Sequence, residues 1–395
     1  MQIGIVGKPN VGKSTFFCAA TMASVEIANY PFTTIEANKG VAYLRAPCPC
    51  KELNIQCQPR NSACVDGVRM IPVELLDVAG LVPDAWQGKG LGNQFLDDLR
   101  QADALINLVD ASGSTDIEGN PVDIGSNDPV EDVKFLENEV DRWIAGIIGK
   151  GFDRIARQAH LQGTKIEAAL HERLTGLAVS ELAIIQALRD VKPPANPQDW
   201  DDDVILAIAS SIRRKGKPMI VAMNKADVAS EDNLDRLQQG DGDYVPTMAE
   251  AELALRRAEK AGVLTYIPGD DSFTVKPEIN LNEGQKKALD YIAQNMKRFG
   301  GTGVQTCLEK AAYGMLDLIV CYPVEDEGKL TDHDGRVLPD AFLMRRGATA
   351  KDLAFKVHTD LGEGFIRGVN ARTKRVVGHD YELQEGDIIK IISRK

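Results

Sequence analysis

The stretch "QIGIVGKPNVGKSTFFCAAT", residues 2–21, decides the fold. Its apolar start is typical of a buried strand, and the residues from Ser14 onward have the character of a helix. Between them, residues 7–14 match the pattern G-x-x-x-x-G-K-[ST]. Such a loop points successive backbone N–H groups at phosphate oxygens, and the N-terminus of the following helix favours negative charge. The stretch therefore predicts a phosphate-binding loop, with Lys13 on the β- and γ-phosphates and Ser14 on Mg²⁺.

The length and periodicity of the chain predict two domains. Its 395 residues exceed the length of about 250 to 300 residues at which single cores stop growing. Short apolar runs alternate with segments of helical period, which indicates an α/β domain with a mainly parallel sheet. We predict this domain at residues 1–315, with a helical insertion at about 129–215, and a small α+β domain at 316–395. The expected strands of the first domain are residues 2–7, 40–44, 71–77, 104–110 and 218–224.

Composition excludes some classes of partner. The net charge of −12 argues against binding of the whole chain to nucleic acid through phosphate neutralisation, so such a contact must come from a local patch. No apolar run approaches the roughly 18 uncharged residues of a membrane helix. The strand at the N-terminus leaves no room for a signal peptide. We expect a cytoplasmic monomer that makes no membrane contact.

Two further motifs separate a nucleotide hydrolase from other proteins with a phosphate loop. The sequence DVAG, residues 77–80, follows a predicted strand. There the Asp77 carboxylate can hold Mg²⁺ through water, and Gly80 can donate its N–H to a γ-phosphate. Thr33 and Thr34 lie between the first helix and the second strand, where a switch loop would present a hydroxyl to the metal.

A fourth motif, NKAD at residues 224–227, ends an apolar strand and selects the base. The two oxygens of Asp227 can accept hydrogen bonds from N1–H and the N2 amine of guanine. Adenine offers an acceptor at N1 and has no amine at that position, so the motif predicts GTP over ATP. Lys225 would lie along the plane of the base, and Asn224 would brace the phosphate loop.

With these four motifs in order, the chain resembles the Obg and YchF group of translation-factor-related GTPases, most closely the archaeal YchF-like proteins. The resemblance extends to "ATAKDLAFKVHTDLGEGF" (348–365) and "LQEGDIIKI" (383–391), which look like a TGS module, a ubiquitin-like β-grasp domain. It implies a P-loop GTPase domain followed by a TGS domain. In the first domain it is carried by "GKPNVGKST" (7–15), "NYPFTTIEAN" (29–38), "DVAGLVPDAWQGKGLGNQFLDDLRQADALINLVDAS" (77–112) and NKAD.

The resemblance implies roles for individual residues. Catalysis falls to Lys13, Thr34 and Gly80. Thr34 is preferred to Thr33 because relatives tolerate a cysteine at the earlier position. The Mg²⁺ ligands are Ser14, Thr34 and Asp77, the last through water. The nucleotide-binding residues are Gly7, Pro9, Asn10, Val11, Gly12, Lys13, Ser14, Thr15, Asn224, Lys225, Asp227 and Ala249.

Several residues depart from related sequences. Thr247-Met248-Ala249 replaces the usual Ser-Ala element, so Ala249 can offer its backbone N–H to the guanine oxygen while Met248 cannot supply the serine contact. Bacterial YchF proteins carry Asn-x-x-Glu at the base-reading motif and favour ATP, so Asp227 points back to GTP. Leu81 stands where Ras-type enzymes place a water-orienting glutamine, which implies slow hydrolysis with the water positioned otherwise.

The asparagine at position 10 suggests a site for a second metal ion. It matches the asparagine that binds K⁺ in several relatives, and K⁺ could supply charge at the phosphates. The alternative is a turn-forming asparagine after Pro9. Residues 84–87, Asp-Ala-Trp-Gln, hold no histidine, so we name no catalytic histidine.

The resemblance implies a Mg²⁺-dependent GTPase that acts as a switch and is linked to the ribosome or other RNA through the TGS domain. Two alternatives stay open: a nucleotide-stabilised RNA-binding adaptor with negligible turnover, and an ATPase of the YchF type. A small-molecule kinase would leave NKAD without a role. The RNA contact would use a basic run, for which a solvated strand face is the competing interpretation. The run is Arg367, Arg372, Lys374 and Arg375.

Four of the seven cysteines form a cluster, Cys48, Cys50, Cys57 and Cys64. Four thiolates could hold tetrahedral Zn²⁺. The first spacing, one residue, departs from the usual two to four, so we expect free or partly buried thiols in a loop and keep zinc as the alternative.

Overall fold

The computed structural model describes residues 1–22, 38–78, 80, 83, 86, 98–163, 165–177 and 179–394. The chain divides into two compact units. The larger unit is built from Met1–Ala20, Asn38–Gly40 and Leu75–Ala311. The smaller unit includes Val41–Glu74 and the residues from Ala312 onward. The domain boundary predicted near residue 316 stays a prediction, and it did not foresee that Val41–Glu74 packs with the C-terminal residues.

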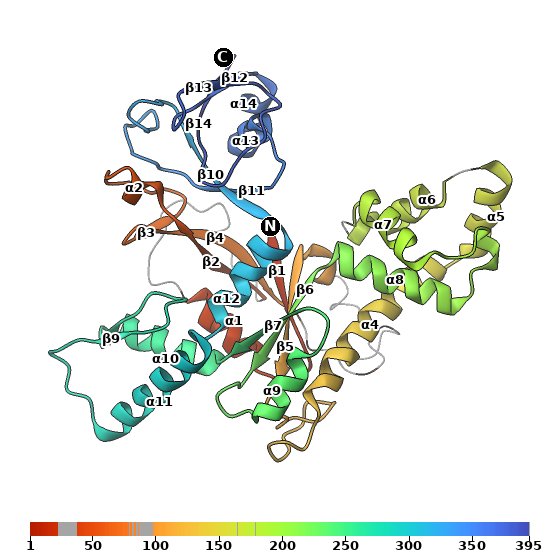
Figure 1. The fold of residues 1–395 in the computed structure, drawn as a ribbon, viewed down its shortest axis with the longest axis horizontal. Helices are drawn as coiled ribbons and strands as arrows, with labels where there is room; N and C mark the ends of the chain where they lie inside the picture. The colour runs from red at the N-terminus through yellow and green to blue at the C-terminus, as the bar shows by residue number, and fades with distance from the viewer. Residues whose placement is uncertain are drawn as a thin grey trace. The chain divides into compact units, whose positions relative to one another are not determined.

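Four parallel strands of a larger mixed sheet form the centre of the larger unit (Figure 1). Strand β1 (Gln2–Val6) pairs in parallel with β5 (Ala104–Asp110), which pairs with β6 (Met219–Asn224), which pairs with β7 (Asp243–Thr247). The full strand order is β2-β4-β1-β5-β6-β7, with β3 (Ala63–Val65) beside β4. Strands β2 and β4 are Lys39–Pro47 and Val68–Asp77. The predicted α/β class with a mainly parallel sheet is confirmed.

The register of these strands aligns their carboxyl ends. Asp110 at the end of β5 pairs with Asn224 of β6, and Asn224 pairs with Thr247 of β7. In parallel sheets, ligands bind outside these ends. The sheet therefore gathers the residues that follow β1, β5, β6 and β7 at one edge.

The segment predicted as a helical insertion consists of helices in the structure. Figure 1 shows α4 and α8 running side by side away from the sheet, with the other three at their far end. Buried Arg213 of α8 donates to Asp141 of α4 at 2.6 Å, which ties the two long helices together. The helices are α4 (Pro129–Gly149), α5 (Phe152–Gln162), α6 (Ile166–Leu174), α7 (Glu181–Val191) and α8 (Asp202–Gly216).

Local sequence explains where these helices begin. Asp128 accepts a hydrogen bond from the N–H of Val130 ahead of α4, with Pro129 in the first turn, and Asp201 accepts from Val204 ahead of α8. Short acidic side chains and an early proline satisfy or replace donors that a helix start leaves free. The apolar side chains between the helices include Val140, Ile144, Leu170, Ile184 and Ile208, all fully buried.

The remaining elements of the larger unit cover the other side of β5 and β6. A second apolar core joins Val109 and Met223 of the sheet to Leu234, Leu255 and Ile292 of the covering helices. These elements are α9 (Glu231–Gln238), α10 (Ala249–Lys260), β8 (Leu264–Thr265), β9 (Thr274–Val275), α11 (Glu283–Phe299) and α12 (Val304–Glu309), while α1 (Lys13–Thr21) follows the loop after β1.

The C-terminal part of the smaller unit is a five-stranded sheet of order β11-β10-β14-β12-β13. Strands β10 and β14 are parallel and the other pairs antiparallel. With a helix between β11 and β12, this is the predicted β-grasp arrangement, and the fold class is confirmed. The elements are β10 (Leu318–Val324), β11 (Phe342–Arg345), α13 (Ala350–Val357), α14 (Thr359–Glu363), β12 (Phe365–Asn370), β13 (Arg375–Val377) and β14 (Ile388–Ser393), and α2 (Pro49–Glu52) belongs to the same unit.

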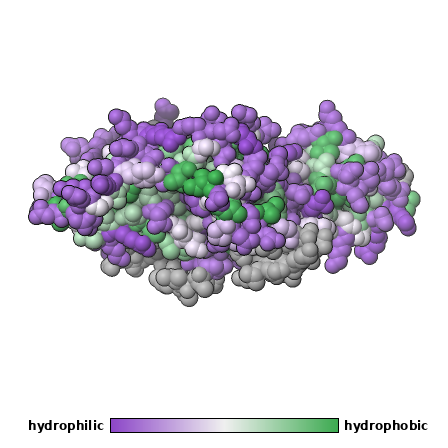
Figure 2. Space-filling model, turned by 90° about the horizontal axis from the view of Figure 1, so that it is seen from below, coloured by the Kyte–Doolittle hydropathy of each residue, from purple (hydrophilic) through white to green (hydrophobic). Residues whose placement is uncertain are grey.

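On the face shown in Figure 2, hydrophilic residues predominate and hydrophobic ones form small patches. Within the part of the chain that the structure describes, every helix is too short or too polar to cross a bilayer.

Candidate nucleotide-binding site

The loop between β1 and α1 has a backbone that only glycine can follow at two positions. Gly7 has φ 143° and Gly12 has φ 100°. A Cβ on Gly7 would lie 2.5 Å from the carbonyl oxygen of Leu108, and one on Gly12 would lie 2.4 Å from Nδ2 of Asn224. Glycine at these positions therefore lets the loop lie directly on β5 and on the end of β6.

The side chain of Asn224 joins this loop to α10. Its Nδ2 donates to the carbonyl oxygen of Val11 at 2.8 Å, and its Oδ1 accepts from the N–H of Ala249 at 3.1 Å. Asn224 is 4% exposed, so these bonds are shielded from water. The sequence predicts that the Ala249 N–H binds guanine. In this structure that N–H already donates to Asn224.

Lys13 folds back onto the loop. Its Nζ donates to the carbonyl oxygens of Gly7 at 3.0 Å and Lys8 at 2.7 Å. Burial lowers the pKa of Lys13 to about 8, although the nearby Asp77 charge opposes the shift. Among the described residues, Lys13 donates to neutral oxygens and forms no ion pair, so it can transfer its N–H groups to a phosphate without first breaking one.

Ser14 and Asp77 meet next to Lys13. Burial raises the pKa of Asp77 and outweighs the Lys13 charge and a hydrogen bond from the Ser14 side chain. Gly80 also comes close, because a Cβ on it would lie 3.1 Å from Lys13 Nζ. A hydroxyl and a carboxylate beside a phosphate lysine are oxygen ligands of the kind that Mg²⁺ takes. Four predicted residues therefore converge at the start of α1.

Lys225 at the end of β6 points to a buried aspartate that the sequence analysis did not name. Its Nζ donates to Asp110 Oδ2 at 2.8 Å and to Ser114 Oγ at 3.1 Å. Burial would raise the pKa of Asp110, but hydrogen bonds from Lys225 and Ser112 outweigh it and lower the pKa. Asp110 is fully buried and also accepts from Thr115, so it fixes both Lys225 and the loop after β5. Its place at the carboxyl end of a predicted strand was the available signal.

Asp227 contacts a residue far along the chain. The hydroxyl of Tyr291 in α11 lies 3.1 Å from the Asp227 carbonyl oxygen and 3.3 Å from Oδ2. Burial and the Asp227 charge raise the pKa of Tyr291. The tyrosine thus holds the carboxylate that is predicted to read the base. No pattern in the sequence pointed to it.

Lys8 and Asn10 attach the phosphate loop to the segment after β5. Lys8 Nζ, almost fully buried, lies 2.6 Å from Asp132 Oδ2. Asn10 has φ 61° and donates through Nδ2 to the carbonyl oxygen of Gly119 at 2.9 Å. The Lys8 ion pair is structural, whereas Asn10 keeps its Oδ1 as an acceptor.

The structure describes some of the other predicted residues but not all of them. Pro9, Val11 and Thr15 lie in the loop and the first turn of α1. Thr33, Thr34 and Leu81 lie outside the described residues, so their predicted roles stay predictions. Trp86 is described, and its backbone N–H donates to Glu139 Oε2 at 3.1 Å.

Comparison with known proteins matches three segments to families. Residues 2–140 match the 50S ribosome-binding GTPase family, residues 222–326 the G4 motif-containing domain of Obg-like GTPases of the YGR210 type, and residues 329–393 the TGS domain. A GTP-binding protein of Methanocaldococcus jannaschii is 55% identical over 395 residues, which cover 99% of each chain. The ribosome-binding ATPase YchF of Haemophilus ducreyi is 28% identical over 98% of each chain. The crystal structure of a GTP-binding protein from Pyrococcus horikoshii is 46% identical, covers 100% of both chains and superposes with a TM-score of 0.78.

The lowered pKa of Lys13 predicts that nucleotide binding depends on pH. Phosphate favours the charged lysine, so its pKa rises on binding, and a proton is taken up at pH values between the free and bound pKa. Affinity for GDP should therefore fall as the pH rises through about 8. Calorimetry in two buffers of different ionisation enthalpy would count the protons.

Lys13→Arg is the matched control, because a guanidinium stays charged throughout this range. Its residual GDP binding should show no proton uptake near pH 8. Equal uptake by both proteins would contradict the assignment to Lys13.

Proposed function

Because the chain belongs to the YchF-like group of Obg-related GTP-binding proteins, we propose that it hydrolyses GTP to GDP and phosphate with Mg²⁺ and acts as a switch. The observation that carries the proposal is the convergence of Lys13, Ser14 and Asp77 at the phosphate loop. Similar chains are named GTP-binding proteins. What we propose beyond binding is that this chain also hydrolyses GTP.

The residues would act as follows. The Nζ of Lys13 leaves the Gly7 and Lys8 carbonyls and donates to the β- and γ-phosphates, where it balances charge that develops during transfer. Ser14 would turn its oxygen from Asp77 to the metal, and Asp77 would hold the metal through water. Bound Mg²⁺ would neutralise charge on the phosphates. Thr34 and Gly80 would complete the metal and γ-phosphate contacts from the two switch segments.

Guanine would be read by Asp227. Its carboxylate oxygens each have two lone pairs, so they can accept from guanine while Tyr291 still donates to Oδ2. Lys225, held by Asp110, would lie along the base. The Ala249 N–H would be shared between Asn224 Oδ1 and the guanine oxygen. The ATPase alternative stays relevant because several relatives carry ATPase in their names.

Asp227→Asn should weaken GDP binding about 100-fold, because a charged acceptor that pairs with two donors is lost. Binding of xanthosine diphosphate should improve, since xanthine presents an acceptor where guanine has its amine. Tyr291→Phe should weaken GDP binding only several-fold, and should have little further effect in the Asp227→Asn background. Calorimetry on the native chain, the two single variants and the double variant tests this double-mutant cycle. Equal affinity of the native chain for GDP and ADP would remove the base assignment.

Hydrolysis would proceed without a water-orienting glutamine, because Leu81 occupies that position. We propose that K⁺ near Asn10 Oδ1 supplies part of the missing charge. The competing function, an RNA-binding adaptor with negligible turnover, shares the same binding residues. A rate measurement therefore has to separate the two.

The test is multiple-turnover phosphate release from GTP and from ATP, each in Na⁺ and in K⁺, with and without ribosomes. We expect slow GTP turnover that K⁺ accelerates, and an Asn10→Gly variant that loses the acceleration. Glycine suits the φ of 61° at this position, so the variant removes the oxygen without backbone strain, and it also removes the hydrogen bond to Gly119. Absence of turnover under all conditions would favour the adaptor, and faster ATP turnover would favour the ATPase.

A ribosome link is proposed from the family matched by residues 2–140, from the TGS domain and from the relative named ribosome-binding ATPase. It would place the chain in the cytoplasm. The basic run contributes less than the sequence suggested. Arg372 pairs with Glu52 at 2.6 Å, and Lys374 donates to the Glu327 carbonyl at 2.8 Å.

The other two basic residues are exposed but do not share a face. Arg375 pairs with Asn370 across the β12–β13 ladder. Arg367 lies three residues from Asn370 on β12, and side chains alternate along a strand, so Arg367 and Arg375 point to opposite sides. Arg367 shares its side with Val376, which is 63% exposed. We therefore centre the proposed RNA contact on Arg367.

Arg367→Glu should lower co-sedimentation with ribosomes about fivefold at low salt, because a phosphate contact becomes a repulsion. Lys356→Glu on α13 changes the net charge equally and should have little effect. GTP turnover without ribosomes should stay the same in both variants. Equal loss in both would indicate a general charge effect and contradict the assigned contact.

A further inference from the structure

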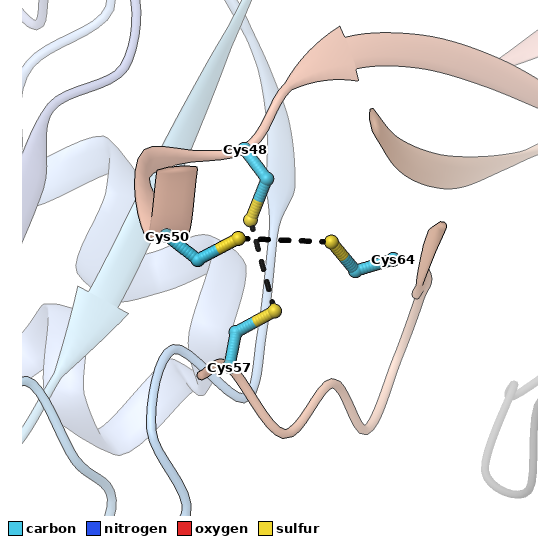
Figure 3. Close-up of side chains that lie close together, drawn as sticks. All are labelled: Cys48, Cys50, Cys57 and Cys64. Atoms are coloured by element: carbon cyan, nitrogen blue, oxygen red, sulfur yellow. Dashed lines mark hydrogen bonds between the residues drawn. The ribbon is translucent and has the colours of Figure 1, made fainter. Parts of the chain in front are cut away.

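The four clustered cysteines converge on one point in the smaller unit (Figure 3). Cys48 precedes α2, Cys50 lies in α2, Cys57 lies in the following loop and Cys64 in β3. Their Sγ atoms all lie within 4.8 Å of one another. Sγ of Cys48 is 3.9 Å from that of Cys57, and Sγ of Cys50 is 3.8 Å from that of Cys64. Three separate pieces of chain thus direct their thiols inward.

These distances match those of a thiolate tetrahedron. A Zn–S bond of about 2.3 Å places sulfur atoms of a regular tetrahedron about 3.8 Å apart. The Cys48–Cys57 and Cys50–Cys64 pairs form opposite edges of such a tetrahedron. Binding would therefore require little movement of the backbone.

The one-residue spacing that argued against zinc has a local explanation. Cys48 is extended, with ψ 129°, and Pro49 begins the short helix that contains Cys50. The change from strand to helix after one residue lets both thiols face the same side. A hairpin turn at Asp66 and Gly67, with positive φ at both, pairs β3 with β4, and the Cys48 N–H donates to the Gly67 carbonyl at 2.8 Å, which keeps Cys64 of β3 near the other cysteines.

A buried cation next to the cluster supplies an independent observation. Arg69 is fully buried, and its guanidinium lies beside Cys48. It donates to Ser62 Oγ at 3.1 Å and to the Leu338 carbonyl at 2.8 Å. Its Nε has no hydrogen-bond partner, and no carboxylate forms an ion pair with it, among the residues that the structure describes.

A buried charge without a counter-charge is costly. Four thiolates around one Zn²⁺ carry a net charge of −2, and this anion would lie directly against Arg69. Four neutral thiols would leave the guanidinium without a counter-charge, with the Tyr322 ring, 5.4 Å away, as a weaker electrostatic partner. The cation therefore favours the metal-bound form of the cluster.

The loop that carries the cysteines also holds the β-grasp. The Gln58 N–H donates to the Val337 carbonyl at 2.8 Å, and the Arg60 N–H donates to the Pro339 carbonyl at 2.7 Å. Asn61 exchanges two hydrogen bonds of 3.0 Å with the backbone of Ala341. The Arg60 side chain pairs with Asp340. Residues 57–64 thus act as a docking edge for residues 337–341.

We propose that Cys48, Cys50, Cys57 and Cys64 bind one Zn²⁺ as four thiolates, and that this metal fixes the docking edge on which residues 337–341 rest. Four protein ligands leave no open position, so the site is structural. The segment contains only a four-residue helix and a three-residue strand, and its apolar side chains pack into the core that it shares with β10 and Leu338. Metal binding would add order to a segment with little regular secondary structure.

The first test is elemental analysis of the full chain purified under reducing conditions. One zinc per chain is expected. Replacement by Co²⁺ should give the intense visible bands of tetrahedral thiolate coordination. Cys57→Ser and Cys64→Ser should lose the zinc, while Cys18→Ser, which removes an exposed cysteine of α1, should keep it.

Hydrogen exchange of the native chain, before and after zinc removal, tests the docking edge. Amides of Gln58, Arg60 and Ala341 should exchange at least about tenfold faster without metal, while the buried β5 amides stay protected. This readout needs no nucleotide, so it stands apart from the proposed GTPase activity. Less than a tenth of a zinc per chain in excess metal, bound iron, or disulfides among these cysteines would overturn the site. Unchanged exchange after zinc removal would overturn its structural role.

Discussion

The two hydrogen bonds of the Asn224 side chain are the constraint on which the nucleotide site depends. One reaches the carbonyl of Val11 in the phosphate loop, and the other reaches the N–H of Ala249 at the start of α10. Gly12 leaves just enough room for this amide, since a Cβ would lie 2.4 Å away. Phosphate loop, base motif and the following helix are therefore positioned by one buried side chain. An unmade bond here would leave a buried polar group unpaired, which is what makes the arrangement rigid.

Four buried or half-buried cations of the larger unit show two kinds of environment. Lys8 and Arg213 face carboxylates, Asp132 and Asp141, and their charges are already balanced. Lys13 instead donates to two neutral carbonyl oxygens, which leaves its positive charge available to an anion. Among the described residues, Lys217 likewise donates to carbonyls, those of Arg100 and Ala102, and it lies near the charge of Asp103. What sets Lys13 apart is therefore its place in the phosphate loop together with its lack of an ion pair among the described residues.

Whether the sequence predicts an interaction depends on how far apart the two partners lie along the chain. The phosphate loop and NKAD were predictable because a strand, a turn and a helix start are local, and the parallel register brings their ends together. Asp110 could have been predicted in the same way, because it ends β5, the strand between β1 and β6. Tyr291 was not, because its contact with Asp227 spans 64 residues and depends on how α11 packs. The packing of Val41–Glu74 with the β-grasp was missed for the same reason, as backbone bonds such as Gln58 to Val337 have no sequence period.

The cysteine cluster shows where a spacing rule fails physically. The usual spacing of two to four residues describes ligands that leave one turn together, and it says nothing about a chain that changes from strand to helix between them. Here Pro49 makes that change, and the hairpin at Gly67 supplies the fourth ligand from another strand. Arg69 then follows the pattern of Lys13: a buried cation satisfied by a carbonyl and a hydroxyl, with no carboxylate in the described chain, facing the place where an anion would form. In both units, a cation that forms no ion pair with a carboxylate among the described residues lies next to the residues with which a ligand is proposed to bind.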